Sequence, residues 1–227
     1  MRQLHQGWLG SLTGARVLEL GAGSGSPMSV WLAKTSAEYT AIDLSKPRLD
    51  ELQATLAGNG VTDASLYATD FLSDDFDQRG FDIVYARSVL HHFRHVEPML
   101  DKLSGCMAPG GMVVSFDPLQ TWWGARLFRN CYRPFQTDAD WEYPFTKKTF
   151  QAIESRFAIE AVQGYFGRSK WALPIAMVAP NSIARSIALR LHRSDQQALT
   201  SVNIIPTCLQ ASLLLRKNGA PQLGVVA

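Results

Sequence analysis

The sequence has few cysteines and no recognisable signal peptide. Its three cysteines, Cys106, Cys131 and Cys208, are widely spaced and form no CxxC pair. This pattern argues against a zinc site, so we expect no metal, and it predicts reduced thiols in the cytoplasm. The first twelve residues lack the basic start, apolar core and small-residue cleavage site of a signal peptide.

Long apolar runs are also missing. The most apolar late stretch, residues 171–191, is broken by Pro174, Pro180, Arg185 and Arg190, whereas a membrane span needs about 20 consecutive apolar residues. With 46% hydrophobic and 19% charged residues, the chain has the composition of an ordinary globular protein. We therefore predict a single domain over residues 1–227.

Acidic charge is scarce in the second half. Residues 1–120 hold 9 Lys/Arg and 14 Asp/Glu, whereas residues 121–227 hold 13 Lys/Arg and 6 Asp/Glu. This imbalance favours an anionic partner for the second half, whether a small acid, a phosphate, an anionic lipid or a nucleic acid. Solvated surface side chains explain it equally well.

Short apolar runs alternate with amphipathic segments in the first half, which predicts a doubly wound α/β fold with a mostly parallel sheet. The predicted strands span 15–20, 39–42, 64–68, 81–85 and 112–116, and the helices 27–34, 45–58 and 96–106. Beyond residue 118 we expect a helix capped by Thr146, strands at 159–166 and 211–216, and an aromatic-rich stretch that is too long for a connecting loop.

The first strand runs into a glycine-rich turn, Gly21–Gly25, and a helix starts directly after it, with Ser26 as N-cap and Pro27 in the first turn. Such a strand, turn and helix start predict a pocket of free backbone N–H groups for a nucleotide-like ligand.

Three carboxylates mark the same edge of the predicted sheet. Asp43 ends the second strand, where its two oxygens match the hydroxyls of a ribose. Asp70 follows the third strand, and with Phe71 it suits a purine and its amine. Glu19 lies inside the first strand, where a charge is costly unless it is paired. We expect it to accept from the N–H groups of the glycine turn or to bind a cationic ligand.

These motifs together resemble the class I, S-adenosylmethionine-dependent methyltransferases of the small-molecule branch. The resemblance covers residues 15–117, and it rests on five segments in register: 17–25, 41–45, 68–71, 81–93 and 107–111. It implies a Rossmann-like, seven-stranded sheet whose last strand runs antiparallel. It also implies S-adenosylmethionine as the methyl donor and a cofactor site made of Glu19, Gly21, Ala22, Gly23, Gly25, Asp43, Leu44, Asp70, Phe71, Arg87 and Ser88.

Two other functions stay open. A nicotinamide-dependent oxidoreductase would use the same kind of turn, but the sixth position of its G-x-G-x-x-G pattern is Ser26 here. A non-catalytic relative that serves as a binding module would have no need to keep the glycine run together with Asp43 and Asp70. Nucleic-acid methylation is disfavoured because no Asp/Asn-Pro-Pro-Tyr/Phe motif follows the fourth strand.

His91 and His92 are the candidates for a general base, which is needed only if the acceptor must lose a proton. Packing and helix capping are the alternative roles for these two side chains. For the acceptor we propose Trp122, Arg126, Arg129 and Arg133, which share one face if residues 119–133 are helical, together with Trp141.

In the family that the sequence resembles, many members carry a longer N-terminal helical segment that helps cover the site, whereas only 14 residues precede the first strand here. We therefore predict lid segments at 118–150 and 165–208. Within the second, a basic amphipathic helix carrying Ile183, Ile187 and Leu191 is expected either to close over the acceptor, which we favour, or to lie on a membrane as a peripheral contact.

Overall fold

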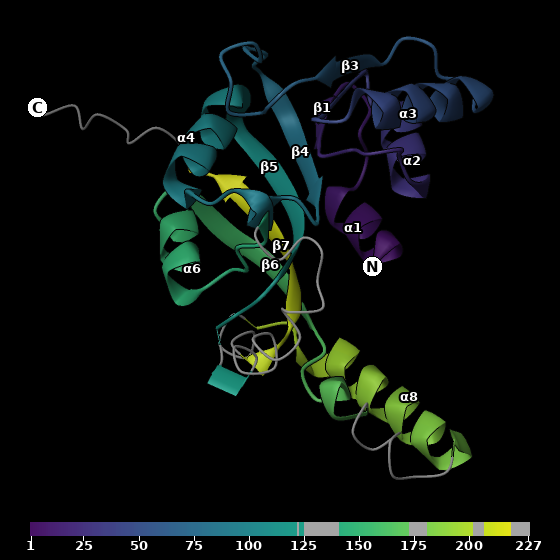
Figure 1. Cartoon of the computed structure of the whole chain (residues 1–227), viewed down its shortest axis with the longest axis vertical. Coiled ribbons are helices and arrows are strands. Elements are labelled where there is room, and N and C mark those ends of the chain that lie inside the picture. The colour runs from purple at the N-terminus through teal and green to yellow at the C-terminus, as the bar shows by residue number, and fades with distance from the viewer. Residues whose placement is uncertain (122, 125–140, 173–180, 202–206, 219–227) are drawn as a thin grey trace, which may run out of the picture.

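The computed structural model describes residues 1–121, 123–124, 141–172, 181–201 and 207–218. One sheet of seven strands, in the order β3-β2-β1-β4-β5-β7-β6, organises these residues (Figure 1). The strands are β1 (Arg16–Leu20), β2 (Glu38–Asp43), β3 (Ser65–Ala68), β4 (Phe81–Arg87), β5 (Met107–Pro118), β6 (Phe157–Tyr165) and β7 (Gln210–Lys217). Strands β1 to β5 pair in parallel, and β7 is antiparallel to both of its neighbours. The predicted Rossmann-like sheet is confirmed.

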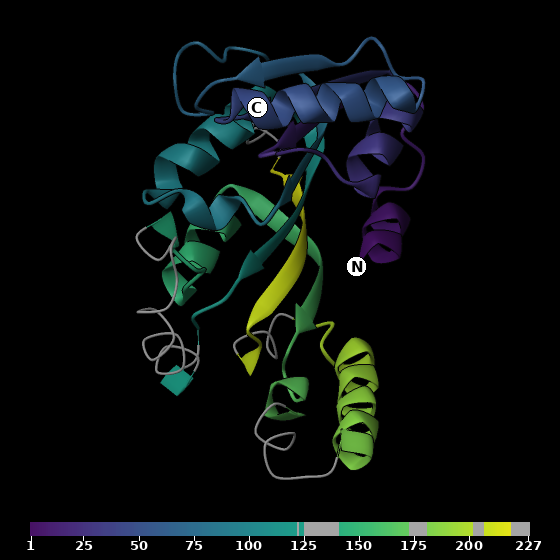
Figure 2. The ribbon, with the colours of Figure 1, turned by 45° about the vertical axis from the view of Figure 1, so that its right-hand side comes forward.

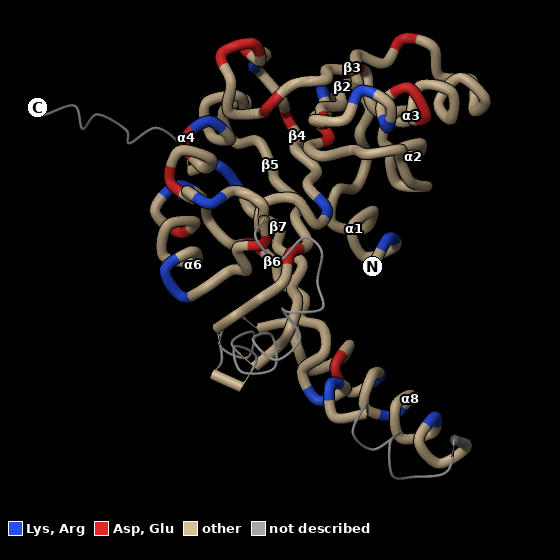
Figure 3. Tube along the Cα trace, viewed as in Figure 1, with Lys and Arg blue, Asp and Glu red and all other residues tan. Residues whose placement is uncertain are grey.

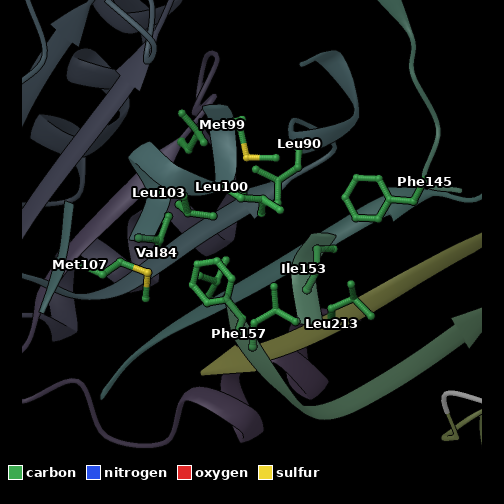
Figure 4. Close-up of a cluster of buried hydrophobic side chains, with 14 of the residues drawn as sticks. Val84, Leu90, Met99, Leu100, Leu103, Met107, Phe145, Ile153, Phe157 and Leu213 are labelled. Carbon is green, nitrogen blue, oxygen red and sulfur yellow. The ribbon is translucent and has the colours of Figure 1, made fainter. Parts of the chain in front are cut away.

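Helices cover both faces of the sheet (Figure 1). Helices α1 (Arg2–Leu9), α2 (Pro27–Thr35) and α3 (Lys46–Gly58) lie on one side, and α4 (Val96–Cys106) and α6 (Lys147–Glu154) lie on the other. Each face therefore has its own apolar core. The core beneath α4 and α6 includes Leu100, Ile153 and Phe157 (Figure 4).

Strand β1 shows why its sequence suits this position. Leu18 and Leu20 belong to the core beneath α4 and α6, whereas Val17 belongs to the core beneath α1, α2 and α3. Successive side chains of a strand point to opposite faces, so apolar residues that face both ways fit a strand covered on both sides.

Two helix starts follow the sequence closely. The Ser26 hydroxyl accepts the N–H groups of Met28 and Ser29, and Thr146 makes the matching bond to Thr149 at the start of α6. These capping boxes satisfy backbone donors that a helix start leaves open. Ser45 occupies the N-cap position of α3, but its side chain makes no capping hydrogen bond.

Strand β5 is longer than predicted. It begins at Met107, five residues before the expected start, and its pairing with β4 is irregular between Phe81 and Ile83. Gly110, with a φ of 72°, lies in this irregular part, where the extra residues of β5 form a bulge.

The two predicted lid segments differ in character. At the end of segment 118–150, Phe145 and α6 pack into the core, and the lid role of this segment stays a prediction. In segment 165–208, the short helix η4 (Ser169–Trp171) and the long helix α8 (Asn181–Ala198) extend away from the sheet (Figures 1 and 2). No helix in the described ranges is both long and apolar enough to span a membrane.

Candidate functional site

The glycine turn lies at the carboxyl edge of the parallel strands, between β1 and α2. Its N–H groups are already used: Gly21 and Ala22 donate to the Ile42 carbonyl, at 2.8 and 3.2 Å, and Gly25 donates to the Ala22 carbonyl at 3.0 Å. Gly23 donates to Oδ2 of Asp43 at 2.8 Å. The predicted pocket of free N–H groups is therefore wrong at these four positions, whose donors hold the turn in shape.

Glycine is required in the turn for two separate reasons. Gly21 and Gly25 have φ values of 65° and 84°, and a Cβ atom on them would lie 2.3 Å from Val89 Cγ2 and 2.5 Å from Leu52 Cδ1. Gly23 has a φ of 54°, and the atom nearest to a Cβ added there would be Arg48 Nη1, at 4.0 Å. The backbone of Gly23 is therefore open to close approach by a ligand.

Asp43 ends β2 and connects this strand to the turn. Its Oδ1 atom accepts the N–H of Ser45 at 2.9 Å, while Oδ2 accepts that of Gly23. Each carboxylate oxygen has a second lone pair, so both oxygens keep acceptor capacity for a ligand. Next to it, Leu44 is 77% exposed, which places an apolar side chain on the surface beside the carboxylate.

Glu19 is buried in β1 and paired with two hydroxyls. Tyr39 donates to Oε2 at 2.6 Å, and Ser29 donates to Oε1 at 2.9 Å. Burial raises the pKa of Glu19 to about 7, against the opposing effects of these two hydrogen bonds and of the Arg87 charge. The predicted bonds to the glycine turn are thus wrong, because the partners are side chains of α2 and β2. Binding of a cation stays a prediction.

Asp70 and Phe71 differ from each other in exposure. Asp70 is exposed after β3, and its Oδ1 accepts the N–H of Leu72 at 2.9 Å. Phe71 is only 3% exposed, and its ring packs edge-on against Phe93 in the core. The predicted cover of a purine by the Phe71 ring therefore needs correction, since the ring offers no free face.

The turn after β4 is the one strained point in the predicted cofactor site apart from the glycines. Ser88 has a φ of 57°, in the left-handed region, and its N–H donates to the Phe116 carbonyl at 2.7 Å. Such a conformation costs about 1–3 kcal/mol for a residue other than glycine. Arg87, just before it, is exposed at the end of β4.

His91 lies below the surface and is paired with a buried acid. Its Nδ1 atom lies 2.9 Å from Oδ1 of Asp117, and its backbone N–H donates to the same oxygen at 3.2 Å. Both side chains are nearly inaccessible. The other oxygen of Asp117, Oδ2, is buried and has no hydrogen-bond partner among the residues that the structure describes. His91 is therefore poorly placed to take a proton from an acceptor itself.

His92, in contrast, is exposed. Its Nδ1 atom lies 2.8 Å from the Trp141 carbonyl, and its ring centre is 4.1 Å from that of His91. Because a carbonyl only accepts, Nδ1 must carry the hydrogen, and in the neutral ring Nε2 then carries the lone pair. A lone pair on an exposed nitrogen is what a general base needs.

The segment before α6 completes this arrangement. Trp141 holds His92 through its carbonyl, and the Tyr143 N–H donates to the His91 carbonyl at 2.7 Å. The Trp141 side chain is 71% exposed. Trp122, Arg126, Arg129 and Arg133, which we predicted for the acceptor, lie outside the described residues.

Sequence reasoning missed the partners of the predicted residues. Tyr39 and Ser29 bind Glu19, and Asp117 binds His91. Asp117 had a signal: like Asp43, it is a carboxylate at the carboxyl end of a parallel strand. Tyr39 and Ser29 had none, because hydroxyls of this kind occur all along the chain.

The site fits a ligand with an adenosine end and an ammonium group. Asp43 offers two acceptor oxygens for a diol, Leu44 offers an apolar surface, and Gly23 leaves its backbone open. Glu19 supplies a carboxyl that a nearby cation would ionise. The described residues contain no group of three or more His, Cys, Asp or Glu that suits a metal ion.

Comparison with known families agrees with this geometry. Residues 18–113 match the model of a family described as a methyltransferase domain. The matched stretch runs from β1 into β5 and contains the glycine turn, Asp43, Asp70 and the two histidines. The resemblance seen in the sequence is thereby confirmed.

The individual proteins that this chain resembles have names that describe different activities. The chain is 24% identical over 162 residues to a highly reducing polyketide synthase, aurA, of Calcarisporium arbuscula, covering 62% of this chain and 6% of that protein. It is 29% identical over 111 residues to a tRNA U34 carboxymethyltransferase of Methylococcus capsulatus, covering 48% and 34%. The chain thus spans a small part of each. A geranyl diphosphate C-methyltransferase of Streptomyces coelicolor superposes with a TM-score of 0.64 at 12% identity, over 96% of this chain and 79% of that one.

Proposed function

We propose that this chain, whose residues 18–113 form a methyltransferase domain, transfers a methyl group from S-adenosylmethionine to a small hydrophobic acceptor that carries an anionic group. The observation that carries the proposal is the set of Glu19, Gly23 and Asp43 at one edge of the sheet. These three residues offer a carboxyl for a cation, an open backbone and an acceptor for a diol, which are the groups that the donor molecule requires.

Each part of the donor has a proposed partner. Asp43 would hold the ribose hydroxyls, and the exposed Leu44 would lie against the adenine, with Asp70 near its amine. Glu19 and the open backbone of Gly23 would hold the methionine end, in a turn that Gly21, Ala22 and Gly25 keep in shape. The Arg87–Ser88 turn would lie beside the sulfonium.

Bound S-adenosylmethionine supplies an electrophilic methyl group. The acceptor's nucleophilic atom forms a bond to the methyl carbon as the carbon–sulfur bond breaks, and the electron pair of that bond passes to sulfur, which leaves S-adenosylhomocysteine. Where the acceptor must lose a proton, we propose that His92 takes it on Nε2, which the Trp141 carbonyl keeps unprotonated by fixing the hydrogen on Nδ1.

The anionic and hydrophobic character proposed for the acceptor comes from the sequence of the second half, with its aromatic and arginine-rich segment and its excess of basic charge. Secondary metabolites, quinones and lipid-like acids have this character. The named relatives do not select among them, since polyketide synthesis, tRNA and geranyl diphosphate appear side by side. We propose a cytoplasmic location because the three cysteines are odd in number, widely spaced and form no CxxC pair.

Isothermal titration calorimetry with S-adenosylhomocysteine and, separately, with NADH tests the proposal. We expect the first to bind and the second not to. Asp43→Asn should weaken S-adenosylhomocysteine binding at least tenfold, because one acceptor oxygen becomes a donor. The control Asp63→Asn, at an exposed position outside the site, should leave it unchanged. Binding of NADH alone would support an oxidoreductase instead, and binding of neither would support a non-catalytic module.

A further inference from the structure

Helices η4 and α8 form an arm that stands away from the rest of the molecule. We define the arm as Ser169–Trp171 and Asn181–Ala198. Both views show α8 extending beyond the end of the sheet rather than lying across it (Figures 1 and 2). A helix in this position leaves much of its surface to solvent, so its exposed side chains call for an explanation.

Hydrogen bonds at the end of α8 hold the arm together and attach it to the sheet, and Lys170 of η4 also donates to the Thr207 carbonyl. Asp195, near the end of α8, is buried, and its carboxylate accepts the N–H groups of Arg168 and Ser169 at 2.8 and 2.9 Å. Just beyond α8, the Leu199 carbonyl accepts the N–H of Gly164 in β6 at 2.7 Å. The Asp195 carboxylate thus joins α8 to the start of η4, and the Leu199 carbonyl joins the end of α8 to β6.

Large apolar side chains gather on the arm. The described residues include nine large hydrophobic side chains that are exposed, and three of them are Trp171, Ile183 and Leu189, each about half exposed. Phe166, just before η4, is a fourth. Single exposed apolar residues are common, but their concentration in one projecting element indicates a contact surface.

The exposed charge of α8 is entirely basic. Arg185, Arg190 and Arg193 are exposed, and the helix has no acid besides the buried Asp195 (Figure 3). Arg185, Leu189 and Arg193 follow at four-residue spacing, which places an apolar side chain between two guanidinium groups on one face. Arginine beside exposed aliphatic and tryptophan side chains is typical of a helix that lies in a membrane interface.

Other occupants fit less well. A second copy of the arm would bring six arginines together, and a few half-exposed side chains do not supply the roughly 800 Å² that each partner buries in a stable complex. A nucleic acid would satisfy the arginines but not the aliphatic side chains of Ile183 and Leu189.

We propose that the arm docks on an anionic lipid surface, with Arg185, Arg190 and Arg193 at the headgroups and Trp171, Ile183 and Leu189 in the interface. Docking requires only the arm. Its consequence for the acceptor rests on the proposed function: the methyl group would then go to an amphiphile that resides in the lipid layer, with its anionic group near the headgroups.

Co-sedimentation with vesicles tests the docking. We expect the full chain to bind vesicles of phosphatidylcholine and phosphatidylglycerol at 50 mM salt, to bind pure phosphatidylcholine much less, and to be released at 1 M salt, where charges are screened beyond about 3 Å. Each basic residue contributes about fivefold to such binding. The triple variant R185Q/R190Q/R193Q should therefore lose about a hundredfold in affinity.

A matched variant separates the arm from overall charge. K34Q/K147Q/K148Q also removes three exposed charges, but none of them belongs to the arm. It should keep its vesicle affinity within about threefold, whereas I183S/L189S should lose about tenfold with all arginines present. Equal losses in the two charge variants, or no vesicle binding by the unmodified chain, would overturn the proposal.

Two more measurements distinguish failure of docking from failure of the proposed function and from self-association. Calorimetry with S-adenosylhomocysteine should give the same affinity in every arm variant, so failure of docking and failure of the proposed function are seen independently. Sedimentation velocity should show no self-association that depends on Leu189. A dimer that I183S/L189S disrupts, without vesicle binding, would show that a second copy covers the arm, contrary to our proposal.

Discussion

The buried imidazole of His91 is fastened to Asp117, whose Oδ1 atom lies 2.9 Å from Nδ1 of the ring and also accepts the His91 backbone N–H. One carboxylate oxygen thus fixes both the side chain and the backbone of the turn Leu90–His92. Because His92 is the next residue, Asp117 positions the proposed base without touching it.

The first prediction concerns this pair. Asp117→Ala should lower the free energy of unfolding by about 1–3 kcal/mol, because two buried donors of His91 lose their acceptor. Asp117→Asn keeps an oxygen in place and should cost less. Urea unfolding measures both. Asp101→Ala, which removes an exposed partner of Arg156, should change nothing measurable. Equal stability of the alanine variant and the unmodified chain would show that Asp117 holds nothing.

His92 is the second test. His92→Ala should lower methyl transfer by about 10²- to 10⁴-fold, the usual contribution of a general base, and leave S-adenosylhomocysteine affinity unchanged. Transfer is measured from tritiated S-adenosylmethionine to whichever member of a panel of hydrophobic acids and phosphates the unmodified chain methylates. His95→Ala, at an exposed position three residues on, is the control. Near-normal turnover in His92→Ala would remove this residue from the mechanism.

We predict that the buried carboxyl of Glu19 releases a proton when the cofactor binds. Burial raises its pKa to about 7, so at pH 6 the free carboxyl is mostly protonated. A bound ammonium favours the ionised form, and the proton must leave. Calorimetry of S-adenosylhomocysteine binding at pH 6, in buffers of different ionisation enthalpy, should show net proton release. Glu19→Gln should abolish it and Glu38→Gln should not. Absence of release in the unmodified chain would place the ammonium elsewhere.

Substitution of Gly23 distinguishes the effect of the turn on stability from its effect on ligand binding. Gly23→Ala and Gly60→Ala both place a Cβ at a positive φ with room around it, so each should cost about 1–2 kcal/mol of stability. Only the first should also weaken S-adenosylhomocysteine binding, by tenfold or more, because its methyl group occupies the ligand's side of the turn. Gly21→Ala should destabilise more, since its Cβ would lie 2.3 Å from Val89. Thermal unfolding and calorimetry measure the two effects, and equal affinities of Gly23→Ala and Gly60→Ala would contradict the assignment.

We predict that the buried side chain of His5 lowers the free energy of unfolding in acid. It is buried between the Tyr85 hydroxyl, 3.2 Å from Nδ1, and the Ser212 hydroxyl, 2.7 Å from Nε2. Burial, with smaller effects of nearby positive charges, lowers its pKa from 6.5 to about 4. The unfolded chain therefore binds the proton more readily, so the contribution of His5 is complete above pH 6.5 and is lost as the pH falls toward 4.

The measurement compares unfolding free energies at pH 7.5 and pH 5. Glu19 acts in the opposite direction, since its raised pKa makes the fold less stable as the pH rises from 4.5 through 7. The difference between the unmodified chain and His5→Gln isolates His5, and this difference should shrink by about 2 kcal/mol at pH 5. The same comparison with His95→Gln, at an exposed position, should show no such change. A pH-independent difference for His5→Gln would mean that His5 titrates normally.

The fold could be predicted from sequence because its signals are local, and the residues proposed to hold the donor rest on signals of the same kind. Alternating apolar runs, the glycine turn after β1 and Asp43 at the end of β2 each depend on residues close together in the chain. The capping boxes at Ser26 and Thr146 are local in the same sense. The acceptor side has no comparable pattern, and its proposed arginines lie outside the described residues.

By itself, the sequence determined where the strands, turns and strand-end carboxylates stand, since backbone sterics and burial act over a few residues. Only the tertiary structure decided which groups meet. The Phe71 ring lies in the core, and Glu19 accepts hydrogen bonds from the hydroxyls of Ser29 and Tyr39. Of two adjacent histidines, one is buried and the other is exposed. The reason is physical: pairing and exposure depend on side chains brought together from distant parts of the chain, as Asp117 meets His91 across 26 positions.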